Sequence, residues 1–219
     1  FGEQSDGWDP SRRIALMNPL SSDLGVMRQS LLFQGLEAIA HNRNHQRPDL
    51  RFFEIGRVYE HKENAENEAA NASHRYTEKE RIGLWQTGKT APENWNNAGH
   101  MATPYSIKSE VYAMLDGLGI ASHAVKEATF QSALFSEGIE LTYQNQSLGR
   151  LGLIRSEVAK KCSINQPVFW ADISMAILTK LSRRKRVKAE EIAKFPAVRR
   201  DLSLILKKGT TFGQLRDCA

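Results

Sequence analysis

Two histidines are the side chains whose type and spacing most directly suggest metal chemistry. His41 and His45 stand four residues apart in an expected helix, which places both imidazoles on one face at a spacing that can ligate zinc. Neither an HExxH pattern nor a third ligand nearby in sequence accompanies them. We therefore interpret both as surface histidines and predict no metal site in this chain.

A dense positive run suggests nucleic-acid binding. It consists of Arg183, Arg184, Lys185 and Arg186, followed by Lys188, at the end of an expected helix. Cations there favourably meet the dipole at the helix carboxyl end, so one interpretation is a solvated helix end and linker. The other is contact with an RNA phosphate backbone, which the net charge of +5 supports weakly. No aromatic residues interleave with the run, so base-specific readout is not predicted.

A helix is expected from about Ser30 to Gln46. Pro48 prevents it from continuing much further. An apolar strand at Ile14 to Met17 and a turn at Asn18-Pro19 are expected before it. One apolar stripe of the helix, which should face a core, is formed by Leu32, Gly35, Leu36, Ile39 and Ala40.

A long strand is expected from Arg51 to Glu60, because the apolar period changes there to two. Its partner is Ile82 to Thr87, and the polar residues Glu63 to Ser73 should form a mobile loop between them. An arginine within such a strand usually pairs with a carboxylate. We expect Arg57 to pair with a neighbouring carboxylate such as Glu54 or Glu80. The two faces consist of Phe53, Ile55, Arg57 and Tyr59, and of Phe52, Glu54, Gly56 and Val58.

The remaining elements predict an α+β domain, with helices packed on a largely antiparallel sheet. A β-hairpin is expected around Asn145-Gln146-Ser147, since apolar runs flank it. The expected elements are a helix at Tyr105 to Leu118, strands at Ile139 to Tyr143, Leu148 to Ile154 and Val168 to Ser174, and a short helix at Met175 to Leu181.

Composition limits the class of protein. With 219 residues, 41% of them hydrophobic, the chain can bury one sizeable core and part of a second domain. It has no signal peptide and no apolar run near 18 residues, so we expect a cytoplasmic protein without membrane contact. Cys162 and Cys218 lie far apart, which argues against a disulfide framework. Because the first residue is Phe1, we expect a piece of a longer protein.

Two blocks carry a resemblance to a known family. The run NPLSSDLGVMRQSLLFQGLEAIAHNRNHQRPDLRFFEIGRVYE resembles the core of bacterial phenylalanyl-tRNA synthetase β subunits, and FPAVRRDLSL resembles the opening of their ferredoxin-like anticodon-binding domain. The resemblance implies a class II synthetase-like antiparallel sheet flanked by helices over residues 1–188. Residues 189–219 would then be a linker and a truncated ferredoxin-like segment. The motif residues are Asn18, Pro19, Arg28, Glu54, Gly56, Arg57, Phe195, Pro196, Arg200 and Asp201.

Departures from the class II pattern predict a core without catalytic residues. Active class II sites place an arginine after the strand that ends in an aromatic residue, where its guanidinium holds the ATP α-phosphate. Here Tyr59 is followed by Glu60, whose charge would repel phosphates. The late segment Val168 to Leu178, where that class has glycine and arginine, has neither. Its bulky side chains should fill the pocket floor.

In the resembled family, catalysis belongs to the α subunit of an assembly of two α and two β chains. The resemblance implies that the whole enzyme uses ATP and magnesium to attach phenylalanine to tRNA(Phe), and that this segment binds no cofactor. Phe33, which lies off the helix stripe, is the candidate subunit contact, and the basic run is the candidate tRNA contact. Alternatives are an active class II adenylate-forming domain and a free-standing RNA-binding module.

Arg200 and Asp201 are adjacent at the start of an expected strand. Their side chains should therefore point to opposite faces.

Overall fold

Contacts divide the chain into two units, Phe1–Lys185 and Arg186–Ala219. The computed structural model describes residues 9–21, 25–62, 75–182 and 194–218. The expected mobile loop at Glu63 to Ser73 and the basic run at Arg183 to Arg186 lie outside the described residues.

The first unit is built on a six-stranded sheet in which all neighbouring strands are antiparallel. Its order is β1-β2-β6-β5-β4-β3, so β1 and β3 are the edge strands. The long β1–β2 pair keeps one continuous register along its whole length. The strands are β1 (Leu50–His61), β2 (Tyr76–Thr87), β3 (Lys126–Thr129), β4 (Phe135–Tyr143), β5 (Gln146–Ile154) and β6 (Val168–Ser174).

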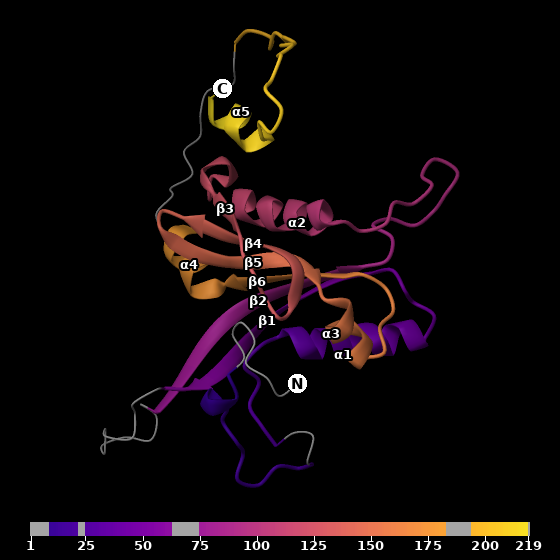
Figure 1. Ribbon diagram of the computed structural model, residues 1–219, viewed down its shortest axis with the longest axis vertical. Helices are drawn as coiled ribbons and strands as arrows, with labels where there is room; N and C mark the ends of the chain where they lie inside the picture. The colour runs from indigo at the N-terminus through magenta and orange to yellow at the C-terminus, as the bar shows by residue number, and fades with distance from the viewer. Residues whose placement is uncertain (1–8, 22–24, 63–74, 183–193, 219) are drawn as a thin grey trace. The chain divides into compact units, whose positions relative to one another are not determined.

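One face of the sheet is covered by α2 (Pro104–Gly117) and α4 (Met175–Ser182), as Figure 1 shows. The start of α2 is fixed by a capping box, in which Thr103 and Ser106 exchange side-chain to backbone hydrogen bonds. The buried core on this face includes Ile82, Ile107, Val111, Leu115, Leu151, Ile173, Leu178 and Leu181.

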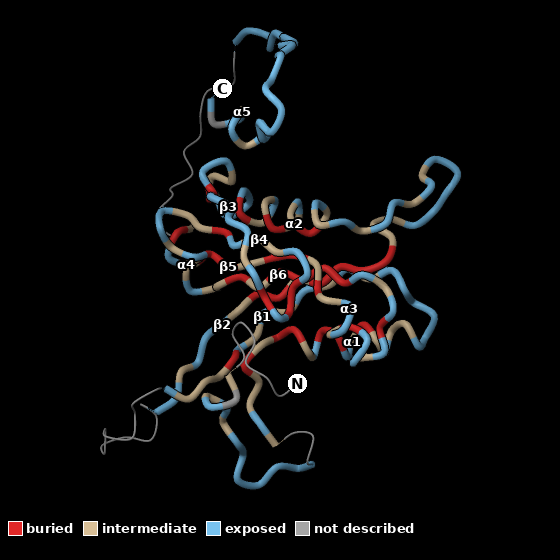
Figure 2. The backbone as a smooth tube through the Cα atoms, viewed as in Figure 1, coloured by how far each residue is buried: buried red, intermediate tan, exposed pale blue. Residues whose placement is uncertain are grey.

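The opposite face is covered by α1 (Leu32–Asn44), with α3 (Ser156–Lys161) adding Ala159 to the same core. Apolar residues of α1 pack there against tryptophans of β2 and β6. The helix comes close because Gly35 has no side chain, since a Cβ at this position would overlap the Trp85 indole. Buried positions gather on the strands and the inward sides of the helices (Figure 2).

Most expected elements are confirmed, with boundaries shifted by a few residues. The expected strand at Ile14 to Met17 is wrong, because only a single bridge, between Ala15 and Val26, forms there. Such a short segment lies away from the sheet and has no ladder to join. Strand β3 and helix α3 had not been expected from the sequence. The described residues of this unit also include the 3-10 turns η1 (Pro10–Arg12) and η5 (Ser122–Ala124).

The second unit contains one short helix, α5 (Phe212–Cys218), among its described residues. The strand expected from Phe195 onward is wrong, since residues 196–206 have no regular secondary structure. The apolar side chains of this segment are exposed, so a strand here would have no core to cover. Arg200 and Asp201 are exposed residues of an irregular segment rather than of a strand. The ferredoxin-like assignment stays a prediction.

Candidate functional site

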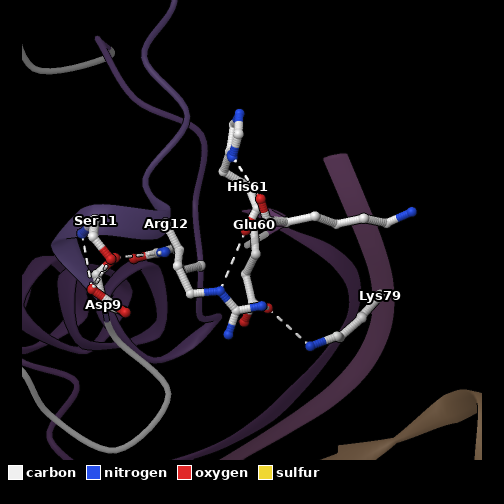
Figure 3. Close-up of polar contacts among 8 residues, drawn as sticks. Asp9, Ser11, Arg12, Glu60, His61 and Lys79 are labelled. Carbon is white, nitrogen blue, oxygen red and sulfur yellow. Dashed lines mark hydrogen bonds and ion pairs between the residues drawn. The ribbon is translucent and has the colours of Figure 1, made fainter. Parts of the chain in front are cut away.

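The carboxylate of Glu60, which the sequence singled out as a departure from the expected class II arginine, lies between two cations. Its Oε2 is 3.0 Å from Arg12 Nη2 and 2.9 Å from Lys79 Nζ, as Figure 3 shows. Only 12% of the Glu60 side chain is exposed, against 32% of Arg12 and 49% of Lys79. The least exposed charge of the group is thus the negative one, and it is satisfied from both sides.

The turn η1 positions Arg12 for this contact. Ser11 donates from its backbone nitrogen and its hydroxyl to Asp9 Oδ1, at 2.9 and 2.6 Å. These two hydrogen bonds, together with the nearby Arg12 charge, hold the pKa of the Asp9 carboxyl below its usual range. Arg12 Nε also donates to the His61 carbonyl at 3.3 Å. The segment before α1 is therefore tied to the end of β1.

This network changes the reason for expecting no phosphate binding at Glu60. The sequence suggested an unpaired carboxylate that would repel phosphates, whereas the carboxylate is paired with Arg12 and Lys79. A phosphate approaching here would have to compete with Glu60 for both cations. The side chains of Arg12, Glu60 and Lys79 join three segments of the chain, which are the turn η1, the end of β1 and strand β2.

A second arginine fastens the same edge of the sheet. Arg28 Nη1 lies 2.7 Å from Glu54 Oε1, and its Nε donates to the Arg57 carbonyl at 2.8 Å. The Arg28 carbonyl in turn accepts from the Tyr59 backbone nitrogen at 2.8 Å. Gly56 provides room for this arrangement, because a Cβ there would lie 2.7 Å from Glu54 Oε1. Three of the expected family-motif residues, Arg28, Glu54 and Gly56, thus meet in one place.

The expected pairing of Arg57 with a neighbouring carboxylate is confirmed, but neither of the two suggested partners is the one it uses. Its Nη1 pairs with Glu78 Oε1 at 3.0 Å rather than with Glu54 or Glu80. Glu80 lies directly opposite in the register and Glu78 lies on the diagonal, within reach of a long side chain. Glu54 is occupied by Arg28 on the other face of the strand. The pair is largely exposed and contributes little stability.

The strand expected to form a filled pocket floor is β6, and it carries bulky buried residues. Trp170 is 1% exposed and stacks on Phe135 with ring centroids 5.5 Å apart. Phe169 is 4% exposed and belongs to the core on the opposite face. Trp170 lies opposite Trp85 in the β2–β6 register, so two indoles occupy the face below α1.

The remaining titratable groups near α1 form no metal centre. His41 and His45 are exposed, with ring centroids 4.4 Å apart. Burial raises the pKa of the Cys162 thiol, and the Glu37 charge raises it further. Within the part of the chain that the structure describes, no group of three or more His, Cys, Asp or Glu side chains could hold a metal ion.

The other predicted site residues do not gather in one place. Phe33 is half-buried and packs against the core below α1, while Asn18 and Pro19 are exposed. Residues Phe195, Pro196, Arg200 and Asp201 are exposed in the second unit. These roles stay predictions.

A hollow of about 620 Å³ lies between the start of α2 and strands β3 to β5. Tyr105, Phe130 and Lys108 line this hollow. The Lys108 Nζ atom lies 2.7 Å from Glu127 Oε2. The cation and the carboxylate there neutralise each other, and a second carboxylate, Glu137, also lines the hollow.

Sequence reasoning missed the cations that complete the Glu60 network. Arg12 and Lys79 lie outside the family-motif residues. It also missed a bidentate pair, in which Arg81 Nη2 and Nε lie 2.6 and 2.8 Å from the two Asp172 oxygens across β2 and β6. The sequence places Arg81 and Asp172 ninety-one residues apart, and no local spacing could have signalled their contact.

Comparison with known families supplies the context for this geometry. The family described as "Phenylalanyl tRNA synthetase beta chain CLM domain" matches residues 2–175. The chain belongs to this family. Phenylalanine–tRNA ligase β subunits of Bacteroides fragilis and Bacteroides thetaiotaomicron are 36% and 34% identical over 96% and 98% of the chain. The chain spans about a quarter, 26%, of the length of these β subunits.

A solved structure of more distant sequence shares the fold of this β-subunit segment. Pyrrolysyl-tRNA synthetase from Desulfitobacterium hafniense superposes with a TM-score of 0.56 at 14% identity. The match covers 80% of this chain and 54% of that protein. The fold is therefore α+β and like that of class II tRNA synthetases. No helix in the described ranges is long and apolar enough to cross a membrane.

Proposed function

We propose that this chain is the non-catalytic core of a phenylalanine–tRNA ligase β subunit and serves as a scaffold that assembles with the α subunit. The observation that carries this proposal is Glu60, held between Arg12 and Lys79 where a nucleotide-binding core would need a phosphate-binding arginine. The three charged side chains pair with one another and in this way join separate segments of the chain.

The packing of the two tryptophans supports the same proposal. Trp85 and Trp170 lie side by side on the face below α1, and each is 1% exposed. α1 packs directly on this face, with Gly35 against the Trp85 indole. Side chains therefore fill this face of the sheet and leave the two indoles almost no contact with solvent.

In the whole enzyme, two α and two β subunits would use ATP and magnesium in the cytoplasm to attach phenylalanine to tRNA(Phe). ATP and magnesium would be bound outside this chain, which we propose binds no cofactor itself. The relatives are named ligase β subunits, which supports a part in the ligase reaction.

We also propose that the C-terminal part helps seat the tRNA. The run Arg183, Arg184, Lys185 and Arg186 is followed by seven cations and four carboxylates between residues 187 and 219. This excess of positive charge favours a phosphate backbone. Replacing the run by glutamine should weaken tRNA binding and make it less dependent on salt. The slope of log affinity against log salt should fall by roughly one for each phosphate that the run no longer neutralises.

Sedimentation of the full-length β subunit with and without purified α subunit tests the assembly proposal. We expect a stable complex with α and no ATP or phenylalanine binding by residues 1–219. Nucleotide binding by these residues would favour the active class II alternative. Tight tRNA binding without α, falling steeply with salt, would favour the free-standing RNA-binding module.

A further inference from the structure

The outer edge of β1 is closed over only part of its length. In an antiparallel strand, the backbone groups of alternate residues point to the same side. The Tyr59 nitrogen bonds to Arg28, the Arg57 carbonyl accepts from the Arg28 side chain, and the His61 carbonyl accepts from Arg12. We call Arg57–His61 the closed half of β1. Its odd-numbered residues direct their backbone groups away from β2.

The other part of this edge, Arg51–Ile55, is the open half. The β1–β2 register continues without a shift, so Phe53 and Ile55 also direct their backbone nitrogens and carbonyls away from β2. Among the residues that the structure describes, none makes a backbone hydrogen bond to these outward groups. The open half therefore presents a row of unpaired donors and acceptors, which is a template for another strand.

Two exposed side chains of the open half, Phe53 and Ile55, are apolar where an unprotected edge is usually charged. Phe53 is 69% exposed and Ile55 is 51% exposed, on the face that α2 and α4 cover elsewhere. Edge strands in monomeric proteins are normally blunted by lysine, proline or a bulge. Positions 53 and 55 carry neither lysine nor proline, and the unshifted β1–β2 register shows no bulge.

The charges that flank the apolar pair restrict what can bind. Arg51 pairs with Glu110 and Arg57 with Glu78, each through Nη1. Their side chains remain 63% and 60% exposed, so other guanidinium nitrogens can reach a second carboxylate. A complementary strand would carry apolar residues at two alternate positions and a carboxylate toward either end.

We propose that the open half of β1 is a strand-addition site for an extended segment of the α subunit with this alternating, acid-flanked pattern. This inference rests on the proposed assembly with α and specifies the contact surface. Main-chain hydrogen bonds to Phe53 and Ile55 supply the affinity, and their side chains with the two arginines select the segment.

Hydrogen exchange of backbone amides in the full-length β subunit, alone and in the α complex, tests the proposal. We expect the Phe53 and Ile55 amides to exchange at least about 100-fold more slowly in the complex. The amides of Phe52 and Glu54, which face β2, serve as internal controls and should change little. Unchanged exchange of Phe53 and Ile55 in a complex that does form would overturn this inference and leave the proposed function intact.

Two further outcomes overturn the choice of partner. Protection already present in dilute β subunit alone would assign the site to another part of the β chain. Protection that appears only as the β concentration rises would assign it to a second copy. If no complex with α forms at all, the proposed function fails together with this inference.

A pair of variants distinguishes backbone hydrogen bonding from nonspecific hydrophobic contact. Ile55→Pro removes an outward N–H that is not part of the β1–β2 ladder, and proline is tolerated at such edge positions. We expect it to weaken α binding roughly 10-fold, the effect of removing about one hydrogen bond. Ile55→Val keeps the N–H and should bind normally. Equal binding by both variants would contradict strand addition, and the exchange test on unaltered protein remains if Ile55→Pro fails to fold.

Discussion

From Arg57 to His61 the outer edge of β1 is fastened by two arginines, whereas from Arg51 to Ile55 nothing in the described ranges pairs with it. Both halves share one strand and one register with β2. The difference comes from the segment before α1, whose Arg12 and Arg28 bond to backbone groups of the closed half only, although Arg28 also pairs with the Glu54 side chain. The contrast shows that an edge strand can be closed against solvent in one part and left able to pair in another.

The largest expected effect on this contrast comes from reversing the central charge of the closed half. Glu60→Arg would place three cations together in a mostly buried position and should lower the free energy of unfolding by about 2–4 kcal/mol. Chemical denaturation measures this loss. Glu60→Gln is the matched control and should cost roughly half as much, because it removes the attraction without adding repulsion. A loss below about 0.5 kcal/mol for Glu60→Arg would show that the network does not fasten the edge.

Removing the second fastener should have a smaller effect. Arg28→Ala deletes the ion pair with Glu54 and the hydrogen bond to the Arg57 carbonyl, both partly exposed. We expect a loss of about 1–2 kcal/mol in the free energy of unfolding by urea titration. Arg28→Lys keeps the charge but lacks the planar guanidinium. Its free energy of unfolding should lie between those of Arg28→Ala and the unaltered chain. Equal stability of Arg28→Ala and the unaltered chain would contradict the role given to Arg28.

The exposed member of the Glu60 network should matter less. Lys79 is 49% exposed and Glu60 would still pair with Arg12 after Lys79→Met. The expected loss is about 0.5 kcal/mol and should shrink further with added salt. A loss as large as that of Glu60→Arg would mean that Lys79, rather than Arg12, carries the network.

The open half should tolerate change with the least effect on stability. Phe53→Ser replaces a side chain that is mostly in water, so the free energy of unfolding should stay within about 0.5 kcal/mol. Phe52→Ser on the same strand is the matched comparison and should cost several times more, since Phe52 stacks on Trp85 with centroids 5.3 Å apart. A large loss for Phe53→Ser would show that the open half already has a partner within this chain.

Local sequence patterns predicted much of the fold because several helices and strands show the apolar periodicity and end signals of their type. The helix Tyr105 to Leu118 combines an apolar stripe with Gly119, and it forms within one residue of the expected ends. Strand β3 was missed because all four of its residues are exposed and show no alternation. The strand expected after Phe195 was wrong because apolar alternation alone does not supply a core to cover.

The candidate site was less predictable because its contacts are distant in sequence. The sequence singled out Glu60 as a departure from an arginine, but not the cations that neutralise it. The Arg12 contact with His61 spans forty-nine residues, and the Arg28 contact with Glu54 spans twenty-six. Only the path of the chain before α1 brings these groups together. The open half was predicted as a strand, yet its missing neighbour became evident only from the strand order.

Calorimetric titration of ATP, with magnesium and phenylalanine present, into this chain tests most directly whether it is a scaffold without a nucleotide site. We expect no saturable binding up to about 1 mM, a free energy weaker than about −4 kcal/mol. Catalytic α subunit, titrated in parallel, should bind. Saturable one-site binding by this chain at micromolar ATP would contradict the scaffold and restore the active-core alternative.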